Sequence, residues 1–232
     1  TAFILALSLL SFGCGGGGGD DEEEENEADF TEAIPNGDVI GVELDEEGGG
    51  QGLTLAEQAQ AAEGQASRFA EHAGKTAERI NDARQIVQTL VDAVVDATPS
   101  IEEIEGRKCR VFEGDKDGNR LVLTSCAVNR VARNFAFKLE GRAAEGSDDD
   151  LKILMAGQAK ILVPNAGKRR GVGRVGFNLD AINELTGNGP TGQVAIGYRA
   201  AGRFRQVVAG FRDFQGDDDA QEFSALYNFK SI

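Results

Sequence analysis

The chain has 232 residues and a formal net charge of -15, and almost all of this charge lies in its first part. Residues 1–52 hold fourteen Asp and Glu and no Lys or Arg, whereas the remaining 180 residues hold 25 acidic and 24 basic residues. A nearly neutral body with arginines scattered along its sequence lacks the clustered basic face of nucleic-acid-binding proteins, so we expect no nucleic-acid partner.

The composition of the body favours a turn-rich β protein. The chain has 31 Gly, 4 Pro, 13 Phe, 2 Tyr and no Trp. Abundant glycine with few prolines suits many short turns, and Phe with aliphatic residues suits the buried face of antiparallel strands.

The first residues have the properties of an export signal. The apolar run at 2–10 is shorter than the about 20 residues of a membrane span, and a small residue, Gly13, precedes Cys14. Residues 1 to 19 resemble the lipobox region of bacterial lipoproteins, which implies a signal peptide at 1–13 and a lipidated Cys14. Without an initiating Met, we expect the chain to begin inside a precursor. The alternative is a buried apolar segment with an incidental cysteine.

This resemblance implies a protein anchored through Cys14 in the bacterial cell envelope, on the periplasmic or surface side of the outer membrane, with an envelope protein or a lipid as partner. Residues 14–52 are glycine-rich and acidic, so we expect a disordered, solvated tether. Two alternatives remain for parts of it. The acidic run after Cys14 is similar to export signals of surface lipoproteins, and Val39–Leu44 could add an edge strand.

A long amphipathic helix is predicted over 53–98. Thr54 and Glu57 fit a capping box, and apolar residues then recur in steps of four and three up to Val94. The stripe is mostly alanine before Gly74 and mostly Ile, Val and Leu from Ile80, so the second half is the expected core element. The alanine-rich half could form a homodimer or remain a bent, partly exposed helix.

Residues 106–232 change to the period of two that indicates strands. The expected strands, with one helical turn at 180–185, are 107–113, 120–128, 131–140, 151–163, 171–179, 193–199, 203–214 and 221–230. Short connections between them predict an antiparallel meander.

Two hairpins have a predicted register. With a type I′ turn at Asp117-Gly118, the numbers of two paired residues sum to 235, so Cys109 lies opposite Cys126. This pairing predicts a disulfide. The alternative is two free cysteines in the core. A two-residue turn at Ala201-Gly202 makes the sum 403, and a bulge is expected between Phe204 and Val207.

The sequence lacks the parts of the common catalytic sites. Its one histidine, His72, lies outside the helix stripe, and no Ser-elbow, zinc-protease or P-loop motif occurs. The match to G-x-G-x-x-G at 171–176 leads into a predicted strand rather than a helix, and Asp115–Asn119 suits a turn better than a calcium loop. The acidic triplets at 148–150 and 217–219 are expected to be solvated, although together they could bind calcium weakly. We expect no enzyme activity, no cofactor and no metal.

These observations predict a mainly β fold with one long α-helix: a curved antiparallel meander of about eight strands, open or nearly closed as a barrel, packed by the N-terminal helix. We expect a non-enzymatic binding or structural module whose concave face the helix fills. If a cavity remains, the protein is a carrier of a lipid or other apolar ligand. The face that would line such a cavity consists of Ala83, Val87, Leu90, Phe135, Phe137, Phe177, Ile196, Val207 and Tyr227.

Overall fold

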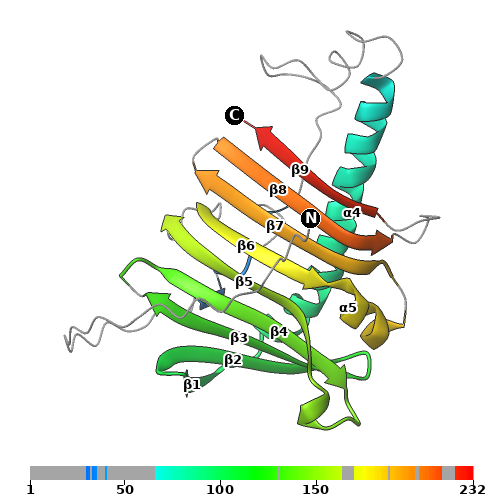
Figure 1. Ribbon diagram of the computed structural model, residues 1–232. Helices are drawn as coiled ribbons and strands as arrows, with labels where there is room; N and C mark the ends of the chain where they lie inside the picture. The colour runs from blue at the N-terminus through cyan, green and yellow to red at the C-terminus, as the bar shows by residue number, and fades with distance from the viewer. Residues whose placement is uncertain are drawn as a thin grey trace.

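The computed structural model describes residues 30–31, 33–35, 40, 66–129, 131–163, 170–187, 189–201, 204–215 and 223–231. Nine strands form one antiparallel sheet in which each strand pairs with the next along the chain (Figure 1). The strands are β1 (Ser100–Ile104), β2 (Arg107–Lys116), β3 (Asn119–Asn129), β4 (Asn134–Ala143), β5 (Lys152–Val163), β6 (Arg170–Asn178), β7 (Thr191–Ala201), β8 (Phe204–Gln215) and β9 (Phe223–Ser231). The helices whose bounds the structure describes are α4 (Ala66–Val95) and α5 (Leu179–Thr186), with a short 3-10 turn, η1 (Asp148–Asp150), after β4.

The predicted antiparallel meander is confirmed, and all eight expected strands are present. One strand was missed: β1, whose five residues are all exposed. A strand with no buried face has no alternation of apolar and polar residues, so its sequence carries no period-two signal. Among the described strands β1 and β9 each have one partner, so the sheet is open rather than closed.

The β2–β3 hairpin has the predicted register. Lys116 pairs with Asn119 and Cys109 with Cys126, and the central residues Asp117 and Gly118 have φ of 51° and 77°, as a type I′ turn requires. The two cysteines form a disulfide with Cα atoms 4.0 Å apart.

The predicted register of the β7–β8 hairpin is wrong by two residues. Ala201 pairs with Phe204 and Ile196 with Ala209, so the paired numbers sum to 405. Ala201 was assigned to the turn, but a turn residue at positive φ favours glycine over alanine, and the pairing extends to Ala201 instead. Because the error is an even number, Val194, Ile196, Val207 and Ala209 remain on their predicted common face.

The bulge in β8 also lies elsewhere. Pairing is continuous around Val207, and the register shifts between Phe211 and Phe214, where Asp213 has φ of 50°. The extra residue turns both phenylalanines to the same side, where their rings lie edge to face with centroids 5.1 Å apart.

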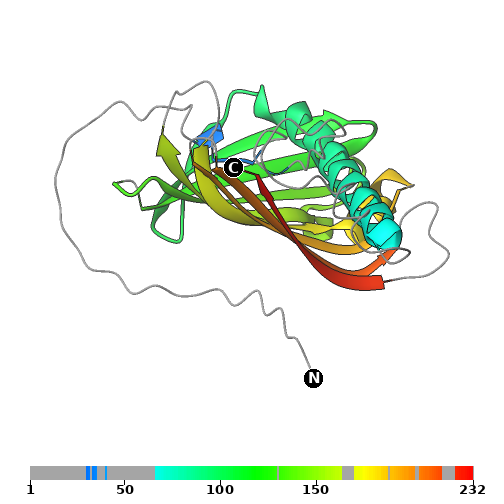
Figure 2. The ribbon, with the colours of Figure 1, turned by 90° about the horizontal axis from the view of Figure 1, so that it is seen from above.

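The sheet is curved, and α4 lies on its concave side (Figure 2). The second half of α4 packs over β2 and β3, and α5 packs over β4, β5 and β7. Of the predicted helix 53–98, residues 53–65 lie outside the described residues, and α4 ends at Val95, ahead of Pro99.

Candidate functional site

The concave face of the sheet collects the side chains predicted to line a cavity. Phe135 and Phe137 on β4, Phe177 on β6, Ile196 on β7 and Val207 on β8 all belong to one buried cluster. The register explains their common side, because Phe137 pairs with Gly157, Gly157 with Val175 and Val175 with Ile196. Tyr227 on β9 is half-buried against the same cluster, with its ring centroid 6.0 Å from that of Phe211.

The helix supplies part of the cover. Val87 and Leu90 are buried, together with Val91 and Val94, on the face of α4 that meets the sheet. The side chains of His72, Ile80 and Ala83 lie outside the described residues. The helix approaches β2 closely at Gly114, where a Cβ would lie 2.9 Å from Cγ1 of Val94 and 3.0 Å from the carbonyl oxygen of Ala93.

A segment of the predicted tether supplies another part. Phe30, Ala33, Ile34 and Ile40 are buried in the main cluster, with Phe30 only 4% exposed. The expectation of a solvated spacer is therefore wrong for these four residues. The physical reason is visible in their spacing, because Phe30, Ala33 and Ile34 stand at i, i+3 and i+4, which places three apolar side chains on one side of a helical turn. We call Phe30, Ala33, Ile34 and Ile40 the plug segment.

The contacts of Phe30 are specific. Its ring lies edge to face with that of Phe135 at 5.2 Å between centroids, and the Arg110 guanidinium carbon lies 5.3 Å from its centroid. The Ser125 hydroxyl donates a hydrogen bond of 3.1 Å to the carbonyl oxygen of Phe30. Arg110 and Ser125 are paired across β2 and β3, and both are buried.

Arg110, Ser125 and the plug segment are not among the site residues predicted from the sequence. Their positions in the predicted β2–β3 hairpin put them on the concave face, because Arg110 alternates with Cys109 and Val111 and pairs with Ser125. The predicted register therefore placed both residues on the apolar face. Their role could not be predicted, because it depends on the plug segment that covers them.

The short helix α5 covers the part of the concave face formed by β4, β5 and β7. The Asn178 side chain accepts from the Ala181 backbone at 3.3 Å at the start of α5, and Gly187 ends the helix with φ of 83°. The Asp180 carboxylate accepts from the backbone N–H of Gly192 at 2.7 Å and ties the helix to β7.

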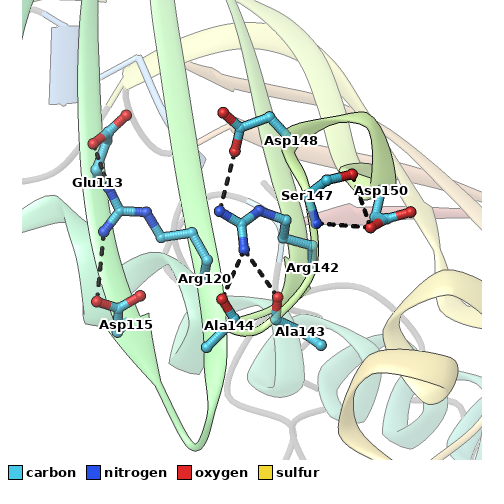
Figure 3. A network of polar contacts seen from close by, with 9 residues as sticks. All are labelled: Glu113, Asp115, Arg120, Arg142, Ala143, Ala144, Ser147, Asp148 and Asp150. Carbon is cyan, nitrogen blue, oxygen red and sulfur yellow. Dashed lines mark hydrogen bonds and ion pairs between the residues drawn. The ribbon is translucent and has the colours of Figure 1, made fainter.

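A polar network lies along β2, β3 and β4 near η1 (Figure 3). Arg120 lies between Glu113 and Asp115 of the neighbouring strand. Arg142 donates to the carbonyl oxygens of Ala143 and Ala144 and to Asp148, each at 3.0 Å. These contacts join the ends of strands and η1, which is a structural role.

Asp150 belongs to the same network. Its carboxylate accepts from the backbone N–H of Ser147 at 2.8 Å and from the Ser147 hydroxyl at 3.1 Å. The backbone bond first, and the hydroxyl bond second, hold the pKa of Asp150 below its usual value.

The arrangement of the concave face is that of a packed core. The described face consists mainly of aromatic and aliphatic groups, and its buried polar groups include the guanidinium of Arg110 and the hydroxyls of Ser125 and Tyr198. In the part of the chain that the structure describes, no group of three or more His, Cys, Asp or Glu is arranged to hold a metal ion. Of the two acidic triplets, that at 217–219 lies outside the described residues.

The N-terminal predictions fall outside the described part of the chain. Cys14, the proposed signal peptide at 1–13 and the acidic run that follows are not described, and nor is most of the tether to residue 52. Neither α4 nor any other described helix combines the length and apolarity that a membrane span needs.

The G-x-G-x-x-G match lies in a strand, as predicted. Residues 171–176 belong to β6, and Gly173 faces Tyr198, whose hydroxyl would lie 2.5 Å from a Cβ at that position. Close packing therefore accounts for this glycine. Comparison of the chain with protein-family models, with curated proteins and with solved structures finds no match in any of the three.

Proposed function

We propose that this protein is a lipid-anchored, extracytoplasmic lipoprotein of the bacterial envelope, whose body is a solid, non-enzymatic binding or structural module. The observation that carries the second part is the filled concave face. Phe135, Phe137, Phe177, Ile196 and Val207 are all at most 4% exposed, whereas side chains lining an open cavity would keep accessible surface. The cover is made by the chain itself, from α4, α5 and the plug segment.

Anchoring rests on Cys14 and the apolar run before it. The test is fractionation of a bacterial host that expresses the full chain or its Cys14→Ser variant. We expect the wild-type protein in the membrane fraction and the variant released after cleavage or retained as precursor. Stable anchoring needs several acyl chains, and these would attach through Cys14. A processed Cys14→Ser protein that remains with the membrane would therefore contradict lipidation.

The carrier function is the second candidate, and one observation favours it. A buried cation and a hydroxyl, Arg110 and Ser125, lie on the apolar face beneath Phe30, where a displaced plug segment would expose them to the anionic head of an amphiphile. The full chain and its Phe30→Ala variant are titrated with an environment-sensitive fluorescent fatty acid. A solid module shows no saturable binding by either protein. Saturable binding that Phe30→Ala strengthens and Arg110→Gln weakens would establish the carrier instead.

We also propose that α4 continues toward residue 53 and that its alanine-rich half mediates a homodimer. The support is the unbroken stripe that includes Ala59, Ala62 and Ala66. Sedimentation equilibrium of the full chain should give a dimer that Ala62→Glu converts to a monomer with an unchanged circular dichroism spectrum. A monomeric wild-type protein would contradict the dimer.

A further inference from the structure

The outer, convex face of the sheet brings together three cations that are far apart in the sequence. Val172 on β6 pairs with Lys160 of β5 on one side and with Arg199 of β7 on the other. Arg174 lies two residues further along β6, and therefore on the same face, opposite to that of the buried Val175. Directly paired side chains stand about 5 Å apart and diagonal ones about 7–8 Å, so the three charges form one cluster. We call Lys160, Val172, Arg174 and Arg199 the basic outer patch.

All four residues of the basic outer patch are at the surface. Lys160, Arg174 and Arg199 are exposed, and Val172 is 38% exposed. Across the strands, Arg174 faces Gln158 and Gly197, and Arg199 faces Val172 and Gln206. The patch was hidden in the sequence because its members are separated by 14 and 25 residues, and only the register of three strands unites them.

The surroundings of the patch carry small side chains and are partly apolar. Ala156, Gly176, Ala195 and Gly210 form a continuous cross-strand row on the same face, ending at Leu226 of β9, which is 76% exposed. A Cβ on Gly176 would meet no described atom closer than 3.9 Å, so packing does not demand a small residue there. The result is a surface with few large side chains that carries positive charge at one part and exposed aliphatic groups on the same face.

We propose that the basic outer patch docks on the anionic phospholipid surface of a bilayer. Lys and Arg are attracted to anionic headgroups, and exposed Val172 and Leu226 can enter the interface beside them. The aliphatic side chains that lie among the cations favour a membrane over a nucleic acid as the partner. This proposal deepens the proposed function and rests on it for the presence of a membrane near the protein. It implies that α4 and the plug segment, on the concave side, point away from the bilayer.

The first test measures charge-dependent vesicle binding. The purified full chain carrying Cys14→Ser is sedimented with phosphatidylcholine vesicles and with vesicles that also contain phosphatidylglycerol. The Lys160→Glu/Arg174→Glu variant should bind the anionic vesicles roughly thirtyfold more weakly or more, since the two lost cations contribute about 1 kcal/mol each and the introduced carboxylates are repelled. Added salt should remove the difference. The control is Lys116→Glu/Lys152→Glu, which has the same net charge but alters two cations outside the patch, and it should bind as the parent does.

Each result of this test decides the proposal. Equal binding of the parent to neutral and anionic vesicles overturns it, as does an equal loss in the two double variants. Stronger binding of the parent to a single-stranded oligonucleotide than to anionic vesicles would assign the patch to nucleic acid. A self-association that the patch variant abolishes, without vesicle binding, would assign it to a second copy of the chain. Because every protein here lacks Cys14, these results are independent of lipidation, which the fractionation experiment tests.

A second test measures orientation. The chain has no tryptophan, so a single introduced one reports on its own position. In the Cys14→Ser background, Val172→Trp fluorescence should be quenched by brominated phospholipid in anionic vesicles, and Ile101→Trp on the distant strand β1, where Ile101 is 66% exposed, should not. Circular dichroism checks that both variants fold. Equal quenching, or stronger quenching at 101, would overturn the docking of this face.

Discussion

The ring of Phe137 can pack on the sheet only because the paired position, Gly157, has no side chain. Phe137 on β4 lies over Gly157 on β5, where a Cβ would stand 2.5 Å from Cζ of Phe137 and 2.5 Å from the carbonyl oxygen of Arg174. The strand backbone there cannot yield easily, because it is paired on both sides. The glycine is thus part of the packing of the phenylalanine ring.

We therefore expect Gly157→Ala to destabilise the protein by about 1–3 kcal/mol through overpacking. Gly176→Ala is the matched control, since that Cβ would meet nothing closer than 3.9 Å and alanine restricts the unfolded chain. Denaturant unfolding measures both. A Gly157→Ala protein as stable as Gly176→Ala would show that the Phe137 ring can move aside.

The pKa of Asp150 predicts a small acid-side effect on stability. Because its pKa is lowered in the folded protein, first by the Ser147 backbone N–H, the stabilisation is present above the unfolded pKa and is lost as the pH falls through the folded pKa. NMR titration should show that Ser147→Ala raises the pKa of Asp150 only part of the way, since the backbone bond of 2.8 Å remains. An unchanged pKa in that variant would mean that the hydroxyl bond is not formed in solution.

At the scale of an element, the β2–β3 hairpin is closed by its turn and its disulfide. Cys109 and Cys126 are 17 residues apart, and closing a loop of this length stabilises a protein by about 3 kcal/mol in the chain-entropy account. Thiol titration of the denatured protein should find neither cysteine free. The Cys109→Ala/Cys126→Ala variant should unfold at lower denaturant concentration, and two free thiols in the wild-type protein would refute the bond.

The plug segment is the element whose position sequence analysis did not anticipate. Phe30→Ala removes a buried ring from Phe135 and Arg110, and we expect a loss of about 3–5 kcal/mol of unfolding free energy. Val131→Ala is the control, because Val131 is 99% exposed and its truncation should change little. A Phe30→Ala protein of unchanged stability would show that the segment does not pack on the sheet in solution.

For the whole molecule, an open meander predicts a gradient of local stability from the centre to the edges. Each central strand is paired on both sides, whereas β1 has one partner and no buried residue. Hydrogen exchange should therefore find the most protected amides in β4 to β7 and near-complete exchange in β1 at early times. Protection of β1 equal to that of β5 would indicate a further partner at that edge.

The sequence by itself determined the features that depend on neighbouring residues. These are eight strands, the turn at Asp117-Gly118 and hence the cysteine pairing, the short helix after β6 and the apolar face of the sheet. These follow from alternation and turn chemistry, which act over a few residues. The tertiary structure decided the rest. Burial of Phe30 and Ile40 depends on an apolar face that is formed by strands about 100 residues further on, and the basic outer patch exists only where three strands align. The register of β7–β8 was misjudged because Ala201 was placed in the turn, whereas pairing along the full strands extends to Ala201 and Phe204.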